Sequence, residues 1–208
     1  MNISPTVQKK RESYHHGDLR AQLIEATRQL VEEKGPDRFS VAEACRRARV
    51  STAAPYKHFK DKTEMLLEVA ADGMRRHATE MIEVVAPFPQ GTLERIIALG
   101  RIYIRFAVAE PGVFRLMFSW ADEDQVDELL TGLGEGTYTF VKLEVAKCLG
   151  RDHITEEDER RALMLWSMVH GMAFLSIDNK LKNERVGDDL EPLLADIAAR
   201  VLPEAKSA

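Results

Sequence analysis

Cysteines, β-strand patterns and long apolar runs are all scarce in this sequence, and each shortage excludes a class of protein. The 208 residues include two cysteines, Cys45 and Cys148, both at apolar positions of predicted helices. Two distant cysteines cannot form the disulfide framework of a small secreted domain. We interpret them as core residues of a cytosolic protein; a redox-sensing pair is the other interpretation.

The sequence also lacks the marks of a membrane protein. Its longest apolar run, around residues 166–177, contains polar side chains and is too short to span a bilayer. The first residues show no apolar secretory signal. We therefore expect a cytoplasmic protein with no membrane partner.

Helical periodicity covers most of the chain, whereas alternating Val, Ile and Thr segments beside turn dipeptides are nearly absent. The predicted fold class is therefore all-α. Besides the two short helices described below, the pattern predicts helices over residues 17–35, 61–85, 92–109, 113–120, 124–149, 155–182 and 190–202.

Catalytic and metal-binding patterns are weak. The glycine-rich stretch 132–136 has no preceding strand and no following Lys-Ser/Thr, so it either thins one helix face for packing or marks a loop. His153 with Asp152 and Asp158 lacks a fourth ligand at metal spacing. No nucleophile stands with a base. We expect no enzyme activity, no cofactor and no metal.

Charge is divided unevenly along the chain. Residues 1–62 hold 13 Lys and Arg against 8 Asp and Glu, a balance of +5, while the remainder holds 16 against 26, a balance of −10. A basic head on an acidic body is typical of a nucleic-acid-binding domain joined to another kind of domain. Lys9, Lys10 and Arg11 form a basic arm that could follow a groove, although solvated terminal charge explains it as well.

Residues 40–59 read as two short helices joined by a tight turn. Ser40 and Glu43, three residues apart, form a capping box for the first helix, and Ser51 can cap the second. This is the pattern of a helix-turn-helix, whose second helix lies in the major groove of DNA. An ordinary helical hairpin is the alternative.

These features together resemble the N-terminal domain of tetracycline-repressor-type (TetR) transcriptional regulators. The resemblance covers about the first 70 residues and rests on residues 14–19, 40–51, 56–59 and 61–62. Trp166 with His170-Gly171 resembles the Trp–His–Gly signature of one C-terminal subgroup. The resemblance implies an all-helical homodimer with a DNA-binding domain, residues 1–62, and an effector-binding and dimerisation domain, residues 63–208.

The resemblance also implies roles for individual residues of the head. It implies phosphate contacts for Ser40, Tyr56, His58 and Lys62, and base-facing positions for Ser51, Thr52, Ala53 and Lys57. A helix N-terminus suits phosphate, and small methyl-bearing side chains can approach thymine. Tyr56 could instead pack in the core of the head, and His58 could be an ordinary surface residue.

Arg49 departs from the family, which usually has glycine in the turn between the two helices. A left-handed backbone costs a non-glycine residue roughly 1 kcal/mol. Arg49 is therefore either a DNA contact that offsets this cost or a sign of a different turn. Pro55 in the second helix is tolerable only because it lies near the helix start.

The second domain is rich in aromatic and methionine side chains. Most must be core, but soft side chains with a few polar groups also suit a cavity for an apolar ligand. Trp166 and His170 share a helix face: either both line such a cavity, or His170 hydrogen-bonds in the core. The nearly all-round apolar segment 163–177 should be surrounded by protein. The candidate ligand contacts are Tyr103, Phe106, Phe114, Met117, Phe118, Trp166 and His170.

These observations favour a transcriptional repressor that leaves a palindromic operator when it binds a small apolar or amphipathic effector. A ligand-independent DNA-binding regulator and a helical metabolite-binding enzyme or carrier are the alternatives. The homodimer should form through the apolar stripe of the last helix, paired with early turns of the helix from residue 155. Its predicted members are Leu190, Leu193, Leu194, Ile197, Val201 and Leu202, with Leu163, Met164 and Trp166.

Overall fold

The computed structural model describes residues 19–119, 128–181, 189–203 and 205, and these are helical without a strand. The prediction of an all-α fold is confirmed. The elements are α1 (Leu19–Lys34), α2 (Val41–Ala48), the 3-10 turn η1 (Pro55–Lys57), α3 (Lys62–Val85), α4 (Leu93–Ala109), α5 (Pro111–Met117), α6 (Glu128–Cys148), α7 (Glu156–Ile177) and α8 (Glu191–Val201).

Side-chain caps explain where several helices begin. Ser40 accepts a hydrogen bond from the Glu43 backbone N–H, and the Glu43 carboxylate accepts one from Ser40, so the predicted capping box of α2 is confirmed. Asp61 caps α3 by accepting from the Glu64 N–H. At the other end of a helix, Gly35 has φ +83° just beyond α1, a conformation that glycine adopts without strain.

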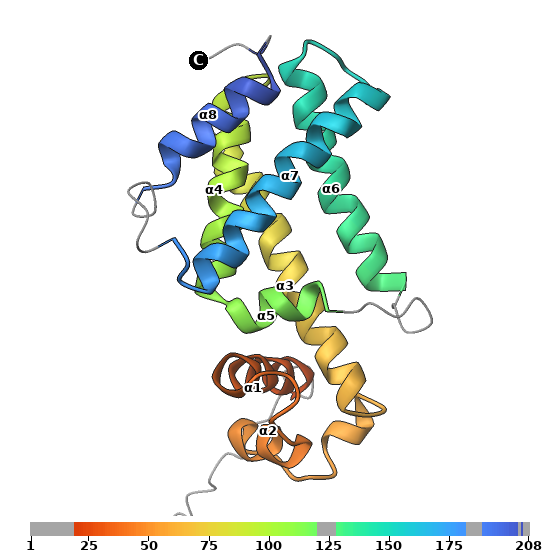
Figure 1. The fold of residues 1–208 in the computed structure, drawn as a ribbon. Coiled ribbons are helices and arrows are strands. Elements are labelled where there is room, and N and C mark those ends of the chain that lie inside the picture. Colours follow the sequence, from red (N-terminus) through yellow and green to blue (C-terminus); the bar gives the residue numbers. More distant parts are fainter. Residues whose placement is uncertain (1–18, 120–127, 182–188, 204, 206–208) are drawn as a thin grey trace, which may run out of the picture.

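The head consists of α1, α2, η1 and the first turns of α3, and it lies below the body in Figure 1. Leu23, Leu30, Phe39, Phe59 and Met65 are buried in its core. Helix α3 continues from this core into the body without a break, so the two parts share one long helix (Figure 1). The boundary predicted at residue 62 coincides with the first residue of α3 and stays a prediction.

The body is built around α4, which packs against α3, α5, α6, α7 and α8. A buried ion pair ties its first turns to α6: Arg95 donates to Glu144 at 2.6 and 2.9 Å. Arg95 also donates to the carbonyls of Val85 and Phe88, which brings the end of α3 to the same point. Removing one partner of such a pair typically costs about 3–5 kcal/mol, so this contact holds three segments of the body together.

Two details of the helices differ from prediction. Pro111 occupies the first turn of α5, where its missing N–H is no loss, so the helix starts two residues earlier than residue 113 and ends at Met117; Trp120 lies outside the described residues. The glycines at 132, 134 and 136 all lie within α6, and a Cβ at any of them would meet nothing within 4 Å. They lie in a helix rather than a loop, and no described residue of the chain packs closely against them.

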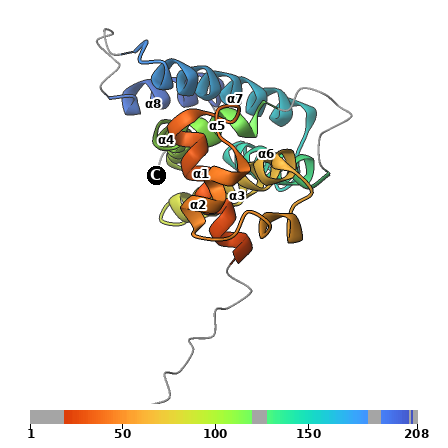
Figure 2. The same ribbon diagram turned by 90° about the horizontal axis from the view of Figure 1, so that it is seen from below.

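The rest of the single chain leaves part of α7 uncovered, so the prediction that protein surrounds residues 163–177 is not met within one subunit. Four large apolar side chains on one face are exposed, with Met164 at 50%. In Figure 1 α7 lies at the front of the body, and in Figure 2 it runs beside α8 along one edge. We call this face the α7 apolar face; it consists of Leu163, Met164, Met168 and Leu175.

Much of the apolar stripe of α8 packs inside its own subunit, so this part is not free to form the predicted dimer surface; the interface itself stays a prediction. Leu194, Val201 and Leu202 are buried, because α8 covers α4 and α7. Leu190, Leu193 and Ile197 are half-buried against the same core. Glutamate at 194 and 197 would therefore disrupt the fold rather than yield folded monomers.

None of the helices in the described part of the chain has the length and apolar character needed to cross a bilayer.

Candidate DNA-binding surface and ligand cavity

The turn after α2 has a left-handed backbone at Arg49, the position where the family usually has glycine. Arg49 has φ 57° and ψ 40°, and its backbone N–H donates to the carbonyls of Arg46 and Cys45 at the end of α2. Glycine is the residue usually found in this conformation. The turn is thus of the expected kind, with arginine at a strained position and its side chain exposed.

The recognition segment is not the α-helix predicted from Ser51 onward. Residues 51–54 form a turn, in which the Ala54 N–H donates to the Ser51 carbonyl, and residues 55–57 form the 3-10 turn η1. Pro55 has no N–H to donate to the carbonyl of Ser51, four residues back, so the first hydrogen bond of an α-helix capped by Ser51 is missing. His58 then closes the segment by donating to the carbonyl of Pro55.

The predicted DNA contacts lie on this segment and at the start of α2. The side chain of Tyr56 is 64% exposed and forms no hydrogen bond with the described residues, so it does not pack in the core of the head. His58 is half-buried, with its ring 6.3 Å from that of Phe59. The exposed candidates are Ser40, Arg49, Ser51, Thr52, Ala53, Tyr56 and Lys57.

Lys62 is the candidate that the structure engages most within the protein. Its ammonium group donates to the Asp37 carbonyl at 3.2 Å and lies 4.4 Å from the centre of the Phe39 ring. It therefore holds the loop between α1 and α2 against the start of α3. A phosphate contact by Lys62 would have to share or replace these interactions.

Sequence reasoning left out three further basic residues of the head. Arg38, Arg46 and Lys60 are exposed in the segments next to the predicted contacts. Arg47, by contrast, forms a two-bonded ion pair with Glu33 of α1, with both distances 2.6 Å. A cluster of basic residues was visible in the sequence, but which of them are paired depends on how α1 packs on α2.

The body contains an apolar cavity of about 410 Å³. Side chains from α3, α4, α6, α7 and α8 line it, together with Met117 and Phe118 at the end of α5. This size lies within the range of natural small-molecule sites. Four predicted ligand contacts line the cavity: Tyr103, Met117, Phe118 and Trp166.

Phe106, Phe114 and His170 are not among the lining residues, which corrects their placement. Phe114 is buried behind the wall, with its ring 5.4 Å from that of Tyr103. His170 Nδ1 lies 2.7 Å from the Tyr103 hydroxyl, which also accepts a hydrogen bond from the Trp166 indole at 3.2 Å. His170 thus follows the second predicted alternative, a hydrogen bond in the core, and burial lowers its pKa.

His77 of α3 is a lining residue that sequence reasoning missed. It is buried, and neither ring nitrogen has a hydrogen-bond partner among the described residues. Burial lowers the pKa of His77 to about 4, so the imidazole is neutral at pH 7. It follows two arginines on a helix, and the sequence holds no signal that this position turns inward.

The head is tied to the body through the start of α5. Glu32 of α1 accepts hydrogen bonds from the backbone N–H groups of Gly112 at 3.0 Å and Val113 at 2.7 Å. These are first-turn donors that the helix itself cannot satisfy. A Cβ at Gly112 would lie 2.8 Å from the Val31 carbonyl oxygen, so only glycine permits this approach of α1.

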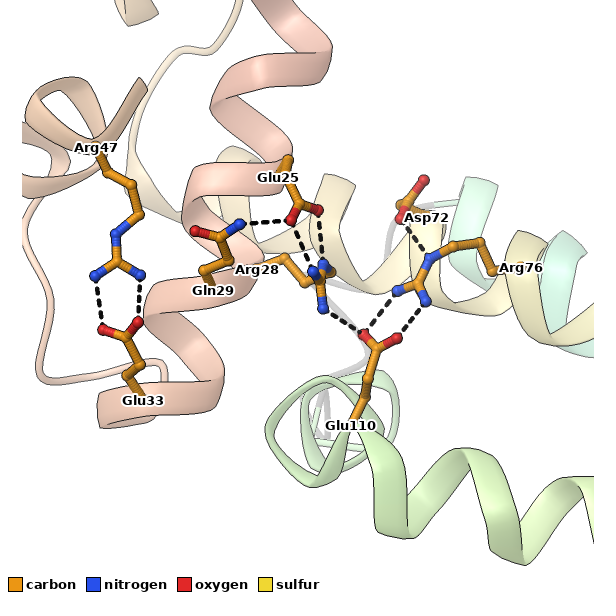
Figure 3. A network of polar contacts seen from close by, with 8 residues as sticks. All are labelled: Glu25, Arg28, Gln29, Glu33, Arg47, Asp72, Arg76 and Glu110. Atoms are coloured by element: carbon orange, nitrogen blue, oxygen red, sulfur yellow. Dashed lines mark hydrogen bonds and ion pairs between the residues drawn. The ribbon is translucent and has the colours of Figure 1, made fainter. Parts of the chain in front are cut away.

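A second link, drawn in Figure 3, joins α1 to the start of α5 through charges and also includes α3. Glu110, between α4 and α5, accepts from Arg76 of α3 at 2.9 Å and from Arg28 of α1 at 3.1 Å. Burial disfavours the charged form of Glu110, but hydrogen bonds and charges from the two arginines outweigh it and lower its pKa. Three helices therefore meet at one ionised carboxylate at the start of α5, the helix whose other end lines the cavity.

Comparisons with known proteins agree with this architecture. The model of the family described as "Tetracyclin repressor-like, C-terminal domain" matches residues 96–201, about half of the chain. The model described as "Bacterial regulatory proteins, tetR family" matches residues 23–69. The chain therefore belongs to the TetR family of bacterial transcriptional regulators. Membership supports a regulator rather than an enzyme; the Trp–His–Gly subgroup stays a prediction.

Individual relatives are more distant. The nucleoid occlusion factor SlmA of Pectobacterium carotovorum is 28% identical over 123 residues, 56% of this chain and 60% of that protein, so this chain spans less than two thirds of it. A protein of unknown function from Rhodococcus sp. RHA1 has a TM-score of 0.78 and 27% identity, over 92% of this chain and 98% of its own. The regulator FadR of Bacillus subtilis in complex with stearoyl-CoA has the same fold, with a TM-score of 0.67 and 15% identity over 89% and 99%.

Proposed function

We propose that this protein is a one-component repressor that leaves a palindromic operator when a small apolar effector fills its cavity. The observation that carries the proposal is the cavity itself, which lies along the helix that also forms part of the DNA-binding head. Residues at 65, 66 and 69 of α3 are buried in the shared core, while Met74, His77 and Met81 farther along line the cavity. One rigid element thus connects the two sites.

On DNA, the exposed side chains of the turn at residues 51–54 and of η1 would meet the major groove. Thr52 and Ala53 can reach base edges there, and Tyr56 and Lys57 can reach phosphates. Ser40 and Arg49, at the two ends of α2, would add contacts to the backbone. The short recognition segment suits close approach to DNA because three of its exposed side chains, those at 51–53, are small.

A homodimer would bring two heads to the two halves of one operator. The α7 apolar face supports this proposal, because large exposed apolar patches on a single chain mark interaction surfaces. Two copies of this face related by a two-fold axis would cover each other. The exposed residues at the ends of α8 would lie at the edge of this surface.

Release would follow from the position of α5. Met117 and Phe118 touch the cavity, while Gly112 and Val113 at the other end of α5 are held by Glu32 of the head. Figure 1 shows α5 between α1 and the rest of the body. An effector that displaces Met117 or Phe118 would move α5, and α1 with it. The shift cannot exceed the difference in effector affinity between the two states.

The cavity also weighs against the ligand-independent regulator, for which a closed core would be expected. FadR, which shares the fold, was crystallised with stearoyl-CoA. That complex supports the idea that this architecture can accommodate a molecule with a long apolar chain. The chemistry of the molecule must be argued from this chain's own lining.

The proposal is tested by fluorescence anisotropy on a duplex selected by the purified protein from random DNA. Apolar compounds that displace an environment-sensitive dye from the cavity should weaken DNA binding by the wild type. They should act less on Trp166→Ala, and as on the wild type on Ile82→Ala, an exposed position of α3 outside the lining. Compounds that fill the cavity and leave DNA affinity unchanged would overturn the proposal.

A further inference from the structure

His77 is a buried polar side chain at the cavity wall whose hydrogen-bonding groups are unused. It is 3% exposed, and no described residue lies within hydrogen-bonding distance of Nδ1 or Nε2. Its neighbours are rings: that of Tyr103 lies 5.4 Å away, edge-on, and that of Phe106 lies 5.0 Å away. An unpaired polar group in such surroundings destabilises the folded chain, so the histidine is not explained by packing.

The other polar groups that line the cavity are hydrogen-bonded or belong to side chains that are at least partly exposed, as the half-buried Tyr138 is. The Tyr103 hydroxyl is shared between His170 and Trp166. The Thr137 hydroxyl donates to the Leu133 carbonyl at 2.8 Å. Thr131 and Glu135, on the α6 wall, are exposed, so water can satisfy them. Among the described lining residues, His77 is therefore the one whose polar atoms are both buried and without a hydrogen-bond partner.

The charges of the lining residues also restrict which ligands the cavity can bind. Among the described residues that line the cavity there is no lysine or arginine, and the carboxylate is the exposed Glu135. His77 is neutral at pH 7 because burial lowers its pKa to about 4, so the ring offers one donor and one acceptor and no charge. A buried carboxylate or phosphate would find no counter-charge there, and its desolvation would be uncompensated.

We propose that the cavity binds an uncharged apolar molecule carrying a hydroxyl or carbonyl group, and that His77 selects it by a hydrogen bond to that group. Both ring nitrogens are covered by neighbouring atoms, so the bond requires the ring to turn about its Cβ–Cγ bond toward the ligand. This inference rests on the proposed function, in which the same cavity takes the effector. It adds that anionic ligands are excluded.

The test uses the full chain and three probes at pH 7.5. Diphenylhexatriene, a fluorescent hydrocarbon without polar atoms, reports the apolar cavity; 1-decanol and decanoate then compete with it. His77→Phe replaces the imidazole by an apolar ring, and Met81→Leu, on the same helix and the same lining, is the matched control. Decanol should bind the wild type more tightly than decanoate. Its Kd should rise about five- to tenfold in His77→Phe alone, the value of one hydrogen bond.

A second measurement needs no variant. The ring nitrogens of His77 in the wild type should change their ¹⁵N chemical shift when decanol is added, and not when the hydrocarbon is added. Equal decanol affinity in wild type and His77→Phe, decanoate binding as tight as decanol, or an unchanged ¹⁵N shift with decanol bound would each overturn the role of His77. Failure of the hydrocarbon itself to bind would instead overturn the effector cavity, so the two failures are distinguishable.

Discussion

At the scale of single residues, the structure singles out side chains that are retained at a cost to stability. Arg49 has a left-handed backbone, and His77 is a buried histidine without a partner. Destabilising features of this kind tend to persist at functional sites. Arg49 lies in the predicted DNA surface and His77 in the cavity, so each supports a function at its own site.

Arg49→Gly should therefore stabilise the protein and weaken DNA binding. Glycine adopts the left-handed conformation without strain, and we expect the free energy of unfolding to rise by roughly 0.5–1 kcal/mol. Loss of a phosphate contact should lower DNA affinity and reduce the salt dependence by about one unit per half-site. Denaturant unfolding and anisotropy at several salt concentrations measure both.

The control for this variant is Asn179→Gly, at the other non-glycine residue with positive φ in the described part of the chain. It lies beyond α7, far along the chain from the head, and should leave DNA affinity unchanged. If Arg49→Gly also left affinity and salt dependence unchanged, Arg49 would be removed from the interface.

His77 should make stability depend on pH. Its pKa is about 4 in the folded protein against an ordinary value near 6.5, so between these values the unfolded chain binds a proton that the folded chain does not. Stability therefore rises with pH across this window, is fully present above it, and is lost as pH falls toward 4. Between pH 7 and pH 5 we expect a loss of about 2 kcal/mol from this residue.

His77→Phe should remove this part of the pH dependence in urea unfolding at the two pH values, and should stabilise the chain at pH 5. His153→Gln, which changes an exposed histidine, serves as the control. A pH dependence in His77→Phe as steep as in the wild type would show that His77 is protonated in the folded protein or solvated there.

At the scale of elements, α5 is the short helix through which, in the proposed mechanism, ligand binding changes DNA binding. We expect Glu32→Gln to uncouple them. One amide oxygen cannot replace two carboxylate oxygens, so either Gly112 or Val113 loses its acceptor and α1 is held less firmly. DNA affinity without ligand should stay near the wild-type value, while the change in Kd caused by an effector should shrink at least about threefold, roughly 0.7 kcal/mol of coupling.

Glu33→Gln is the matched control on the same helix, because Glu33 pairs with Arg47 inside the head and, among the described residues, forms no hydrogen bond or ion pair with α5. The measurement is the operator Kd with and without a saturating compound. Full coupling in Glu32→Gln, together with a normal fold, would show that the signal passes along α3 instead.

The second element with a testable role is α7. Met164→Glu combined with Met168→Glu places two charges on the α7 apolar face and should convert a dimer into folded monomers by light scattering. Because both side chains are exposed in the single chain, the subunit should keep its helical circular dichroism. Ile82→Glu, at a side chain of α3 that is 60% exposed, should remain dimeric. A double mutant that stays dimeric would place the interface elsewhere.

Much of the element pattern could be predicted from sequence because helix ends carry local signals. Ser40, Asp61 and Thr155 each cap the helix that the pattern predicts. The prediction of an α-helix from Ser51 onward was wrong because the missing N–H of Pro55 outweighs a capping serine. The burial of much of the α8 stripe and the exposure of apolar side chains on α7 could not be predicted, since periodicity reveals an apolar face but not what covers it.

The cavity was only partly predictable for the same reason. Tyr103 and Trp166 were identified because aromatic side chains at helical spacing point to the interior of the body. His77 was missed because a single histidine after Arg75 and Arg76 looks like part of a solvated face. Its burial depends on the packing of α3 against α4, which no local pattern encodes.

At the scale of the whole molecule, we propose that two heads on one dimer bind a symmetric DNA site and release it when the body is occupied. The symmetry of the protein must then be mirrored in the DNA. A single head would offer a short basic surface and weak selectivity, so strong sequence preference itself requires two.

The most direct measurement is selection of duplexes from a random pool by the purified full-length protein, with sequencing of the enriched DNA and light scattering of the complex. The account predicts an inverted repeat whose half-site centres are about one helical turn, or a multiple of it, apart, bound by an even number of protomers. No enrichment, or an asymmetric site bound by a single protomer, would contradict it.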